Sequence, residues 1–276
     1  MSVGLLVLLL ALGLAAVMAF AWSAVVRSGK SGFADAVWSI GTGAACAIAA
    51  IVPSVGAAPS LRQGVMAALL LLWGLRLGLH IAGRAAHGDD PRYAELKKQW
   101  GARYRSRLFL FLQIQAAASL VLAVSVIAAA RNPAPDFGLA DWIAVAIVAV
   151  AVAGEAIADR QLAAFRADPR NKGRVCDVGL WGLSRHPNYF FEWLVWMALP
   201  FFAFDASGGH PFGFVALAAP ALMYWLLVRV SGIPPLEEHM LRSRGAAFRA
   251  YQRRVNAFWP GPPRPETQTV ERNPSP

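Results

Sequence analysis

The sequence alternates long apolar stretches with shorter polar ones. Seven stretches are long and apolar enough to cross a bilayer, and they lie at about 3–26, 34–54, 64–83, 108–130, 139–159, 188–204 and 212–230. Backbone groups in lipid must be hydrogen-bonded within their own segment, and none of the stretches alternates polar and apolar residues as a barrel strand does. The pattern therefore predicts an all-α, polytopic membrane protein with seven transmembrane helices.

Composition agrees with this picture. Of the 276 residues, 57% are hydrophobic and only 15% are charged, whereas about a quarter of the residues in a soluble domain are charged. Seven spans leave room only for short loops, which excludes a separate soluble domain. Basic cytoplasmic loops explain the net charge of +10, so we expect no nucleic acid among the partners.

The basic residues also predict the orientation. When the loops are assigned alternately to two sides, one side receives all but three of the 26 Lys and Arg residues. The other side carries only Arg62 and Arg131, and Arg76 lies inside the third stretch. By the positive-inside rule the C-terminus is cytoplasmic and the N-terminus is outside. We expect residues 1–262 to form the membrane domain and the Pro-rich residues 263–276 to form a disordered tail.

Ionisable and polar residues inside the apolar stretches indicate where function lies, because they are costly in lipid. They occur at four places on the cytoplasmic half: Asp35, the pair Arg76 and His80, the pair Glu155 and Asp159, and the pair Asn188 and Glu192. Each pair is spaced i, i+4 and so shares one helix face. Each of these residues, taken alone, has a purely structural explanation: a position at the membrane surface, a side chain that snorkels to the interface, or a hydrogen bond between helices. Together they predict a polar cavity that opens to the cytoplasm.

The basic segment around NKGRVCDVGLWGLSRHPNY predicts an anion site. Its cations are Arg170, Lys172, Arg174 and Arg185. They lie beside a helix N-terminus, whose backbone N–H groups attract phosphate. Ordinary positive-inside charge is the alternative explanation. No Walker A or GxGxxG motif occurs. Cys46 and Cys176 lack metal-ligand spacing, so we predict no metal site.

Two segments resemble the C-terminal half of the steroid 5α-reductase-like membrane proteins: RVCDVGLWGLSRHPNYFFEWLVW and SGIPPLEEHMLRSRGAAFRAYQRRVNAFWPGPP. With FADAVWSIG, LWGLRLGLH, GDDPRYAELKKQWG and EAIADRQLAAFRADPRNKGRVCDVGLW, the chain resembles more narrowly the bacterial DUF1295 branch, over roughly residues 30–262. The superfamily also includes sterol reductases and isoprenylcysteine carboxyl methyltransferases, which have a similar RHPxY element. The resemblance to the reductases implies a seven-helix bundle that holds NADPH in a cytoplasm-facing cavity and takes a lipidic enone from the membrane.

The resemblance also implies the cofactor site. In the family, an Asp and an Arg seven residues apart contact the dinucleotide, an NxxxE element meets the nicotinamide end, and a tail segment closes over the cofactor. At these positions and in the RHPxY element this chain has Asp159 and Arg166, Asn188 and Glu192, Tyr251 with Arg253 and Arg254, and Arg185, His186 and Tyr189. Together with Arg170, Lys172 and Arg174, these residues form the predicted NADPH site.

At the substrate end the chain departs from the steroid enzymes. Trp73 stands where they have a tyrosine that helps hold the substrate ketone, and Asp35 is only the acid nearest to their partner glutamate. This argues against a steroid substrate but leaves the reduction of a conjugated C=C bond. The charge that develops on the carbonyl oxygen would be met by a protonated Asp35, or by Arg76 or His80. The predicted catalytic residues are Asp35, Trp73, Arg76 and Glu192.

Two other functions fit the same residues. A methyltransferase that uses S-adenosylmethionine would share the RHPxY element, although Asn188, Glu192 and the basic segment favour the larger, more anionic dinucleotide. A transporter or lipid-binding scaffold would usually show internal repeats and interrupted spans, and neither is evident in the sequence. We therefore predict an NADPH-dependent reductase of the bacterial inner membrane that faces the cytoplasm. Its partners would be membrane lipids and a hydrophobic small molecule that enters from the bilayer.

Overall fold

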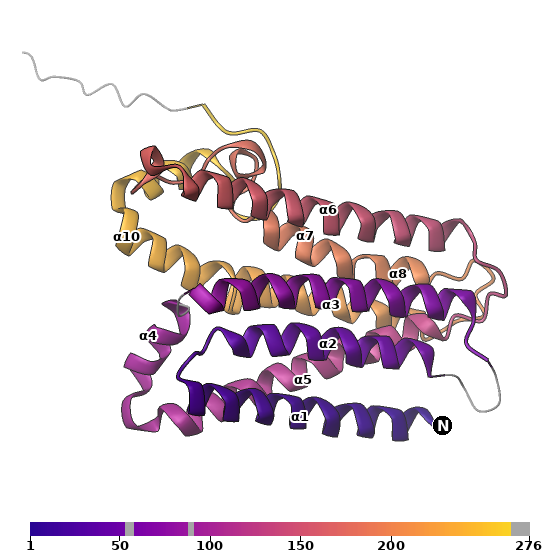
Figure 1. Ribbon diagram of the computed structural model, residues 1–276. Helices are drawn as coiled ribbons and strands as arrows, with labels where there is room; N and C mark the ends of the chain where they lie inside the picture. The colour runs from indigo at the N-terminus through magenta and orange to yellow at the C-terminus, as the bar shows by residue number, and fades with distance from the viewer. Residues whose placement is uncertain (53–57, 88–90, 266–276) are drawn as a thin grey trace, which may run out of the picture. The chain divides into compact units, whose positions relative to one another are not determined.

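The computed structural model describes residues 1–52, 58–87 and 91–265, and every regular element in this part of the chain is helical (Figure 1). The helices of the N-terminal part are α1 (Val3–Ser28), α2 (Phe33–Ile51), α3 (Leu61–His87), α4 (Pro91–Trp100), α5 (Tyr104–Ala130) and α6 (Leu139–Ala167). Those of the C-terminal part are α7 (Pro187–Trp196), α8 (Ala198–Phe202), α9 (Ala218–Trp225) and α10 (Ile233–Arg254). The predicted all-α class is confirmed for these residues. Most of the predicted disordered tail, residues 266–276, lies outside them.

Six helical segments of the described chain are long and apolar enough to cross a membrane, as expected of a polytopic membrane protein. They overlap all the predicted stretches except 188–204, and residues 53 and 54 of the second stretch lie outside the described residues. Over residues 188–204 the structure has two consecutive helices in place of one, because α7 ends at Trp196 and α8 begins at Ala198. Pro200 has no N–H to donate to the Trp196 carbonyl. At the break, the Met197 N–H bonds to a carbonyl only three residues back.

The chain forms two compact units. Unit 1 comprises Met1–Val152 and Trp193–Trp225, and unit 2 comprises Ala153–Glu192 and the chain from Leu226 onward. In unit 1, α2 packs along α3 and also contacts α1 and α5 (Figure 1). A hydrogen bond of 2.7 Å between the hydroxyls of Thr42 and Ser119 joins α2 to α5. The central position of α2 explains why its buried face consists of small residues.

The close approach of α2 and α3 depends on glycines. A Cβ on Gly43 would lie 2.9 Å from the Cα of Gly74, and a Cβ on Gly78 would lie 3.0 Å from the Ala36 carbonyl oxygen. Neither distance leaves space for a methyl group without moving backbone. Lipid provides little hydrophobic drive for helix association, so close packing of small residues is what stabilises such a helix pair.

The outward faces of unit 1 are apolar. On α1, Leu6 and Met18 are buried, yet Leu12 is 60% exposed and Phe20 is 66% exposed. A helix that is apolar on every side is suited to lipid rather than to water. These exposed side chains support the prediction that membrane lipids are direct partners of the chain.

Unit 2 is built around α10. Its core consists of Phe248, Tyr251 and Val255, against which Val175, Met240 and Leu241 pack. α10 kinks at Gly245, whose φ of 48° lies in the left-handed region that favours glycine. Because of the kink, residues from both halves of α10 share one core.

Candidate functional site

The RHPNY segment of unit 2 is tied to α10 by the half-buried carboxylate of Glu237. The Glu237 carboxylate lies 2.7 Å from Arg185 Nε, 2.9 Å from His186 Nε2 and 2.7 Å from Gln252 Nε2. The side chains of Arg185, His186 and Glu237 are 11%, 4% and 13% exposed. We call these four residues the Glu237 cluster. It fixes the predicted cofactor-binding turn to α10.

Arg185 also caps the C-terminal end of α10. Its Nη1 donates to the carbonyls of Gln252 and Val255, and its backbone N–H donates to the Asn256 carbonyl at 2.9 Å. The last carbonyls of a helix lack helical partners, and a cation there is favoured by the helix dipole. The sequence predicts that Arg185 contacts the cofactor, whereas in the structure its guanidinium binds Glu237 and the end of α10.

His186 is a neutral histidine inside the Glu237 cluster. Burial lowers its pKa below the usual 6.5, against the raising effect of Glu237. We assign the ring proton to Nε2 because this atom faces the carboxylate, which leaves Nδ1 as an acceptor. Nδ1 is buried and has no hydrogen-bond partner within the described chain. The ring of Tyr189 stacks on the imidazole at 5.5 Å between centroids. Nδ1 is therefore an open position for a ligand or a water.

Tyr251 fixes the segment that precedes the RHPNY turn. Its hydroxyl donates to the Trp181 carbonyl, and Trp181 Nε1 donates to the Ala158 carbonyl of α6 at 2.9 Å. On the same helix, the Gln161 side chain accepts a bond from the Leu180 N–H at 2.9 Å. Tyr251, predicted to close over the cofactor, is thus a buried residue that joins α10 to the loop after α6.

Two of the predicted cofactor arginines form surface ion pairs. Arg170 pairs with Asp168 at 2.7 Å, and its guanidinium holds the pKa of Asp168 below the usual range. Arg254 pairs with Asp177 at 2.8 Å. Five further predicted cofactor residues are exposed or half-buried: Arg166, Lys172, Arg174, Asp159 and Asn188.

Two buried carboxyl groups lie on the helices that flank this loop. Glu155 on α6 is 3% exposed and Glu192 on α7 is 5% exposed. The two helices touch directly beside them, since a Cβ on Gly154 would come within 2.3 Å of the Phe191 ring. Asn188 precedes Glu192 by one turn on the same face of α7. An amide and a carboxyl so placed can bind a neutral amide by paired hydrogen bonds.

Asp35, a predicted catalytic residue of unit 1, is engaged by α4. Its carboxylate accepts a bond from Arg92 Nη2 at 2.7 Å and another from the Tyr93 hydroxyl at 2.7 Å, one on each oxygen. The side chain is 14% exposed. Both oxygens of Asp35 thus accept hydrogen bonds from α4, which gives this carboxylate a role in positioning that helix. Its predicted role as proton donor stays a prediction.

Trp73, the second predicted catalytic residue of unit 1, is the centre of a tryptophan cluster. Its ring is 0% exposed and packs edge to face on Trp196 at 4.9 Å and on Trp38 at 6.4 Å between centroids. The indole N–H groups of Trp38 and Trp196 are buried and have no acceptor among the residues that the structure describes. Arg76 follows Trp73 on α3 and is half-buried. Indole N–H groups of this kind can donate to a carbonyl oxygen.

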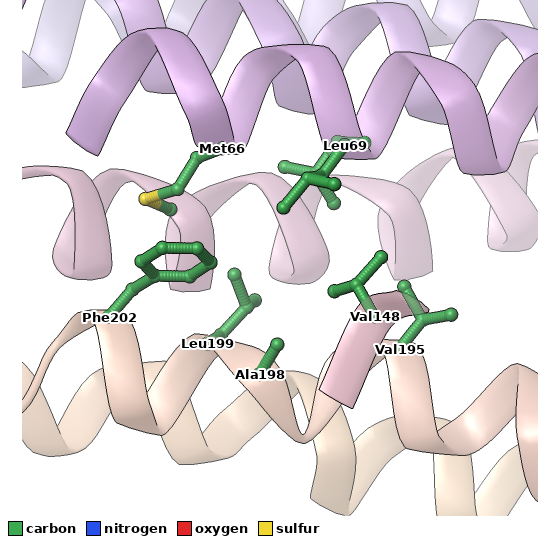
Figure 2. A pocket seen from close by; sticks show the side chains of 8 residues that line it. Met66, Leu69, Val148, Val195, Ala198, Leu199 and Phe202 are labelled. Atoms are coloured by element: carbon green, nitrogen blue, oxygen red, sulfur yellow. The ribbon is translucent and has the colours of Figure 1, made fainter. Parts of the chain in front are cut away.

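A small cavity lies between helices of unit 1. It has a volume of about 10 Å³ and is lined by Met66, Leu69, Leu70, Val148, Val195, Ala198, Leu199 and Phe202 (Figure 2). All of these side chains are apolar, and the space suits about one water molecule. Leu70 and Val195 are close neighbours in sequence of Trp73 and Trp196. A lipidic substrate would have to move side chains to enter here.

Sequence reasoning missed four of the contact residues: Glu237, Gln252, Arg92 and Tyr93. Glu237 stands in the segment PPLEEHM, where its acidity was visible but did not distinguish it from Glu238. Arg92 and Tyr93 stand in GDDPRYAEL, a segment that contributed only to the family resemblance. Ion pairs between distant segments leave no periodic signal in the sequence, so only the folded chain identifies them.

The observed fold is that of an all-helical membrane protein, and the chain belongs to the family described as "Protein of unknown function (DUF1295)", which matches residues 19–255. The predicted family is thereby confirmed. The chain is also similar to the uncharacterized protein C594.04c of Schizosaccharomyces pombe, with 27% identity over 229 residues. This match covers 73% of the chain and 64% of that protein, so the chain spans less than two thirds of its relative. No solved structure matches the chain.

Proposed function

We propose that this protein is an NADPH-dependent reductase of a C=C bond conjugated to a carbonyl in a lipidic molecule. The observation that carries the proposal is how the predicted residues divide between the units. Every residue predicted to contact the cofactor belongs to unit 2, whereas Asp35, Trp73 and Arg76, predicted for the substrate end, belong to unit 1. The resemblance of the sequence to the steroid 5α-reductase-like proteins supplies the reaction class.

The polar groups of unit 2 suit the nicotinamide end of a dinucleotide. Asn188 and Glu192 offer an amide and a buried carboxyl on one face of α7, which would bind a carboxamide. The buried Nδ1 of His186 offers an acceptor that no described residue uses. When bound, NADPH supplies the hydride. The side chains of unit 2 would hold and orient it.

The exposed cations of unit 2 suit the phosphate end. Lys172 and Arg174 are exposed beside the segment that leads to the RHPNY turn, and Arg166 is exposed on α6. An arginine can bind a phosphate through two parallel N–H groups, and lysine adds a compact charge. This surplus of cations favours NADPH over NADH, because NADPH carries the additional 2′-phosphate.

The groups of unit 1 would meet the negative charge that develops on the substrate oxygen. Arg76 carries a permanent charge, and the indole N–H groups of Trp38 and Trp196 are donors in a dry environment, where such interactions are strong. With Asp35 engaged by Arg92, we assign the stabilising role to Arg76 and these indoles. His80 follows Arg76 by one turn and would support it.

We further propose that α7 and α8 together complete a seventh span and that the C-terminus faces the cytoplasm of a bacterial inner membrane. The distribution of Lys and Arg supports this orientation. Of the two arginines on the proposed outer side, Arg62 is 5% exposed and forms an ion pair of 2.6 Å with Asp141. The charge of Arg62 is therefore neutralised inside the fold and adds little to the outer surface. This increases the difference in positive charge between the two proposed sides of the membrane.

Calorimetric titration of the full chain in detergent tests the cofactor. We expect NADPH to bind at least tenfold more tightly than NADH. Glu192→Gln keeps the side-chain shape and removes the charge, and should weaken NADPH binding about tenfold, or about 1.4 kcal/mol, in a monodisperse protein. Glu238→Gln, which changes an acid that is 68% exposed, is the matched control and should bind as wild type.

Two results would overturn the proposal. Binding of S-adenosylmethionine without measurable affinity for NADPH would identify a methyltransferase. Binding of neither molecule by a folded protein would favour a transporter or scaffold. If NADPH binds, oxidation of the reduced nicotinamide in the presence of a panel of steroid, prenyl and other lipidic enones identifies the substrate class.

A further inference from the structure

A second cavity of unit 1 is lined by polar and apolar groups in similar measure. It has a volume of about 170 Å³ and lies where the C-terminal end of α1 meets α4 and the start of α5. Two cations, two phenols and two valines contribute to its wall: Lys97, Arg105, Tyr93, Tyr104, Val25 and Val26. The cavity shares no residue with the predicted cofactor or catalytic sets. A ligand bound there would be independent of the proposed function.

The two cations of this cavity, Lys97 and Arg105, are not paired with an acid among the residues that the structure describes. Lys97 Nζ lies 5.9 Å from the centroid of the Tyr104 ring, a cation–π arrangement that keeps the ammonium beside the cavity. The carboxylate of Asp35, which binds the Tyr93 hydroxyl, is already paired with Arg92. Among the described residues, the wall therefore presents positive charge and no acid.

The cavity also has a firm scaffold. Trp22 Nε1 donates to the Arg105 carbonyl at 2.8 Å, which joins the last turns of α1 to the first turn of α5. The Tyr93 ring is 3% exposed and packs on Phe111 of α5 at 6.3 Å, which fixes α4 on the other side. The cations are thus carried by backbone that is fixed by neighbouring helices.

The position of the cavity along α1 indicates the source of the anion. The outward side of α1 is apolar through Phe20, which is 66% exposed, and Arg27 and Lys30 follow at the helix end. Aromatic side chains such as Trp22 and basic residues mark the level of lipid headgroups. Val25 and Val26 would adjoin acyl chains, while Lys97 and Arg105 would adjoin a phosphate. Polybasic sites at this level attract anionic lipids.

We propose that this cavity binds the phosphate of an anionic phospholipid headgroup. Charge assistance from Lys97 and Arg105 gives the affinity, since hydrogen bonds between a cation and a phosphate are stronger than those between neutral groups. A zwitterionic headgroup carries its own cation, which would lie against the same two residues. The site therefore selects anionic over zwitterionic lipids. Free phosphate offers the same anion but lacks the acyl chains beside Val25 and Val26.

Native mass spectrometry of the full chain released from micelles tests this selection. Phosphatidylglycerol, phosphatidylcholine and inorganic phosphate are the three probes. We expect wild type to retain phosphatidylglycerol and to lose the other two. Lys97→Gln/Arg105→Gln should weaken phosphatidylglycerol binding at least tenfold. Lys98→Gln/Arg107→Gln removes the same charge from the same helices outside the cavity and should stay within twofold of wild type. All these side chains are exposed, so the variants should fold.

Three outcomes would overturn the proposal. Equal loss in both double variants would show general surface attraction. Equal retention of phosphatidylcholine by wild type would show that charge does not select the lipid. Saturable binding of inorganic phosphate that depends on Lys97 and Arg105, without retention of phosphatidylglycerol, would make the free anion the occupant.

Discussion

Glu237→Gln perturbs the centre of unit 2 with the smallest possible change of shape. The carboxylate meets Arg185 Nε and His186 Nε2 on one oxygen, and Arg185 Nη2 and Gln252 Nε2 on the other. A glutamine has one acceptor oxygen and one NH₂ group. Whichever way the new amide is turned, its NH₂ faces at least one guanidinium N–H. The variant therefore loses both charge and an acceptor.

The size of the expected loss comes from these contacts. A hydrogen bond to a charged group contributes about 1.5–3 kcal/mol, and one between neutral groups about 0.5–1.5 kcal/mol. Neutralising Glu237 should therefore cost about 1 kcal/mol for each of its three partner side chains. Solvent screens little of this effect, because the carboxylate is 13% exposed. We expect the free energy of unfolding to fall by about 2–4 kcal/mol.

Unfolding in mixed micelles, followed by tryptophan fluorescence, measures this loss. Glu238→Gln is the control. The Glu238 carboxylate is next to Glu237 in sequence but is 68% exposed, and it pairs with Arg242 at 2.9 Å within the same helix. Such a surface pair contributes about 0.3–0.5 kcal/mol. The affinity for NADPH should fall in Glu237→Gln, since the cluster fixes the RHPNY turn, and should stay unchanged in the control. Equal stability of the two variants would disprove the central role of Glu237.

Three further predictions concern other parts of the chain. Arg62→Met should lower the free energy of unfolding by about 3–5 kcal/mol, because it leaves Asp141 buried without its partner. The control Arg131→Met should lower it by less than about 1 kcal/mol. Thermal unfolding of both variants measures the difference. Acidification below about pH 6.5 should destabilise unit 2, because His186 takes up a proton more readily in the unfolded chain than in its buried position. Above that pH the effect is absent. A His186→Gln variant should show a flatter dependence of stability on pH. Asp35→Asn should increase amide hydrogen exchange across α4 and leave NADPH affinity within twofold; unchanged exchange would contradict the role of Asp35 in positioning α4.

Most of the helices could be predicted because the bilayer allows few alternatives. A long apolar segment whose backbone must bond to itself becomes a helix. The break at Met197 could not be predicted in the same way, because proline is tolerated within membrane helices where other groups satisfy the freed carbonyl. Whether Pro200 interrupts the helix depends on its neighbours in the fold. Hydropathy does not contain that information.

The candidate site was predictable only where it depends on local spacing. Asn188 and Glu192 share a face because they stand one turn apart, and no folding information is needed to place them together. Glu237 and Glu238 are chemically the same, and only the path of α10 decides which of them faces Arg185 and His186. The bond between Arg92 and Asp35 joins residues 57 positions apart. Local spacing does not reveal such a pairing, so the contact of Asp35 with α4 could not be predicted.

The glycine seam between α2 and α3 has a consequence for the electrostatics of unit 1. Gly43 lies against Gly74, and Gly78 lies against the Ala36 carbonyl, so the two helices meet in a single antiparallel register. Followed one residue beyond the last contact, this register brings Asp35 level with the turn of α3 that carries His80. A slip of one turn, about 5.4 Å, would bring a side chain onto backbone. Residues without side chains therefore set the register of the two helices, and with it the level at which Asp35 and His80 lie along them.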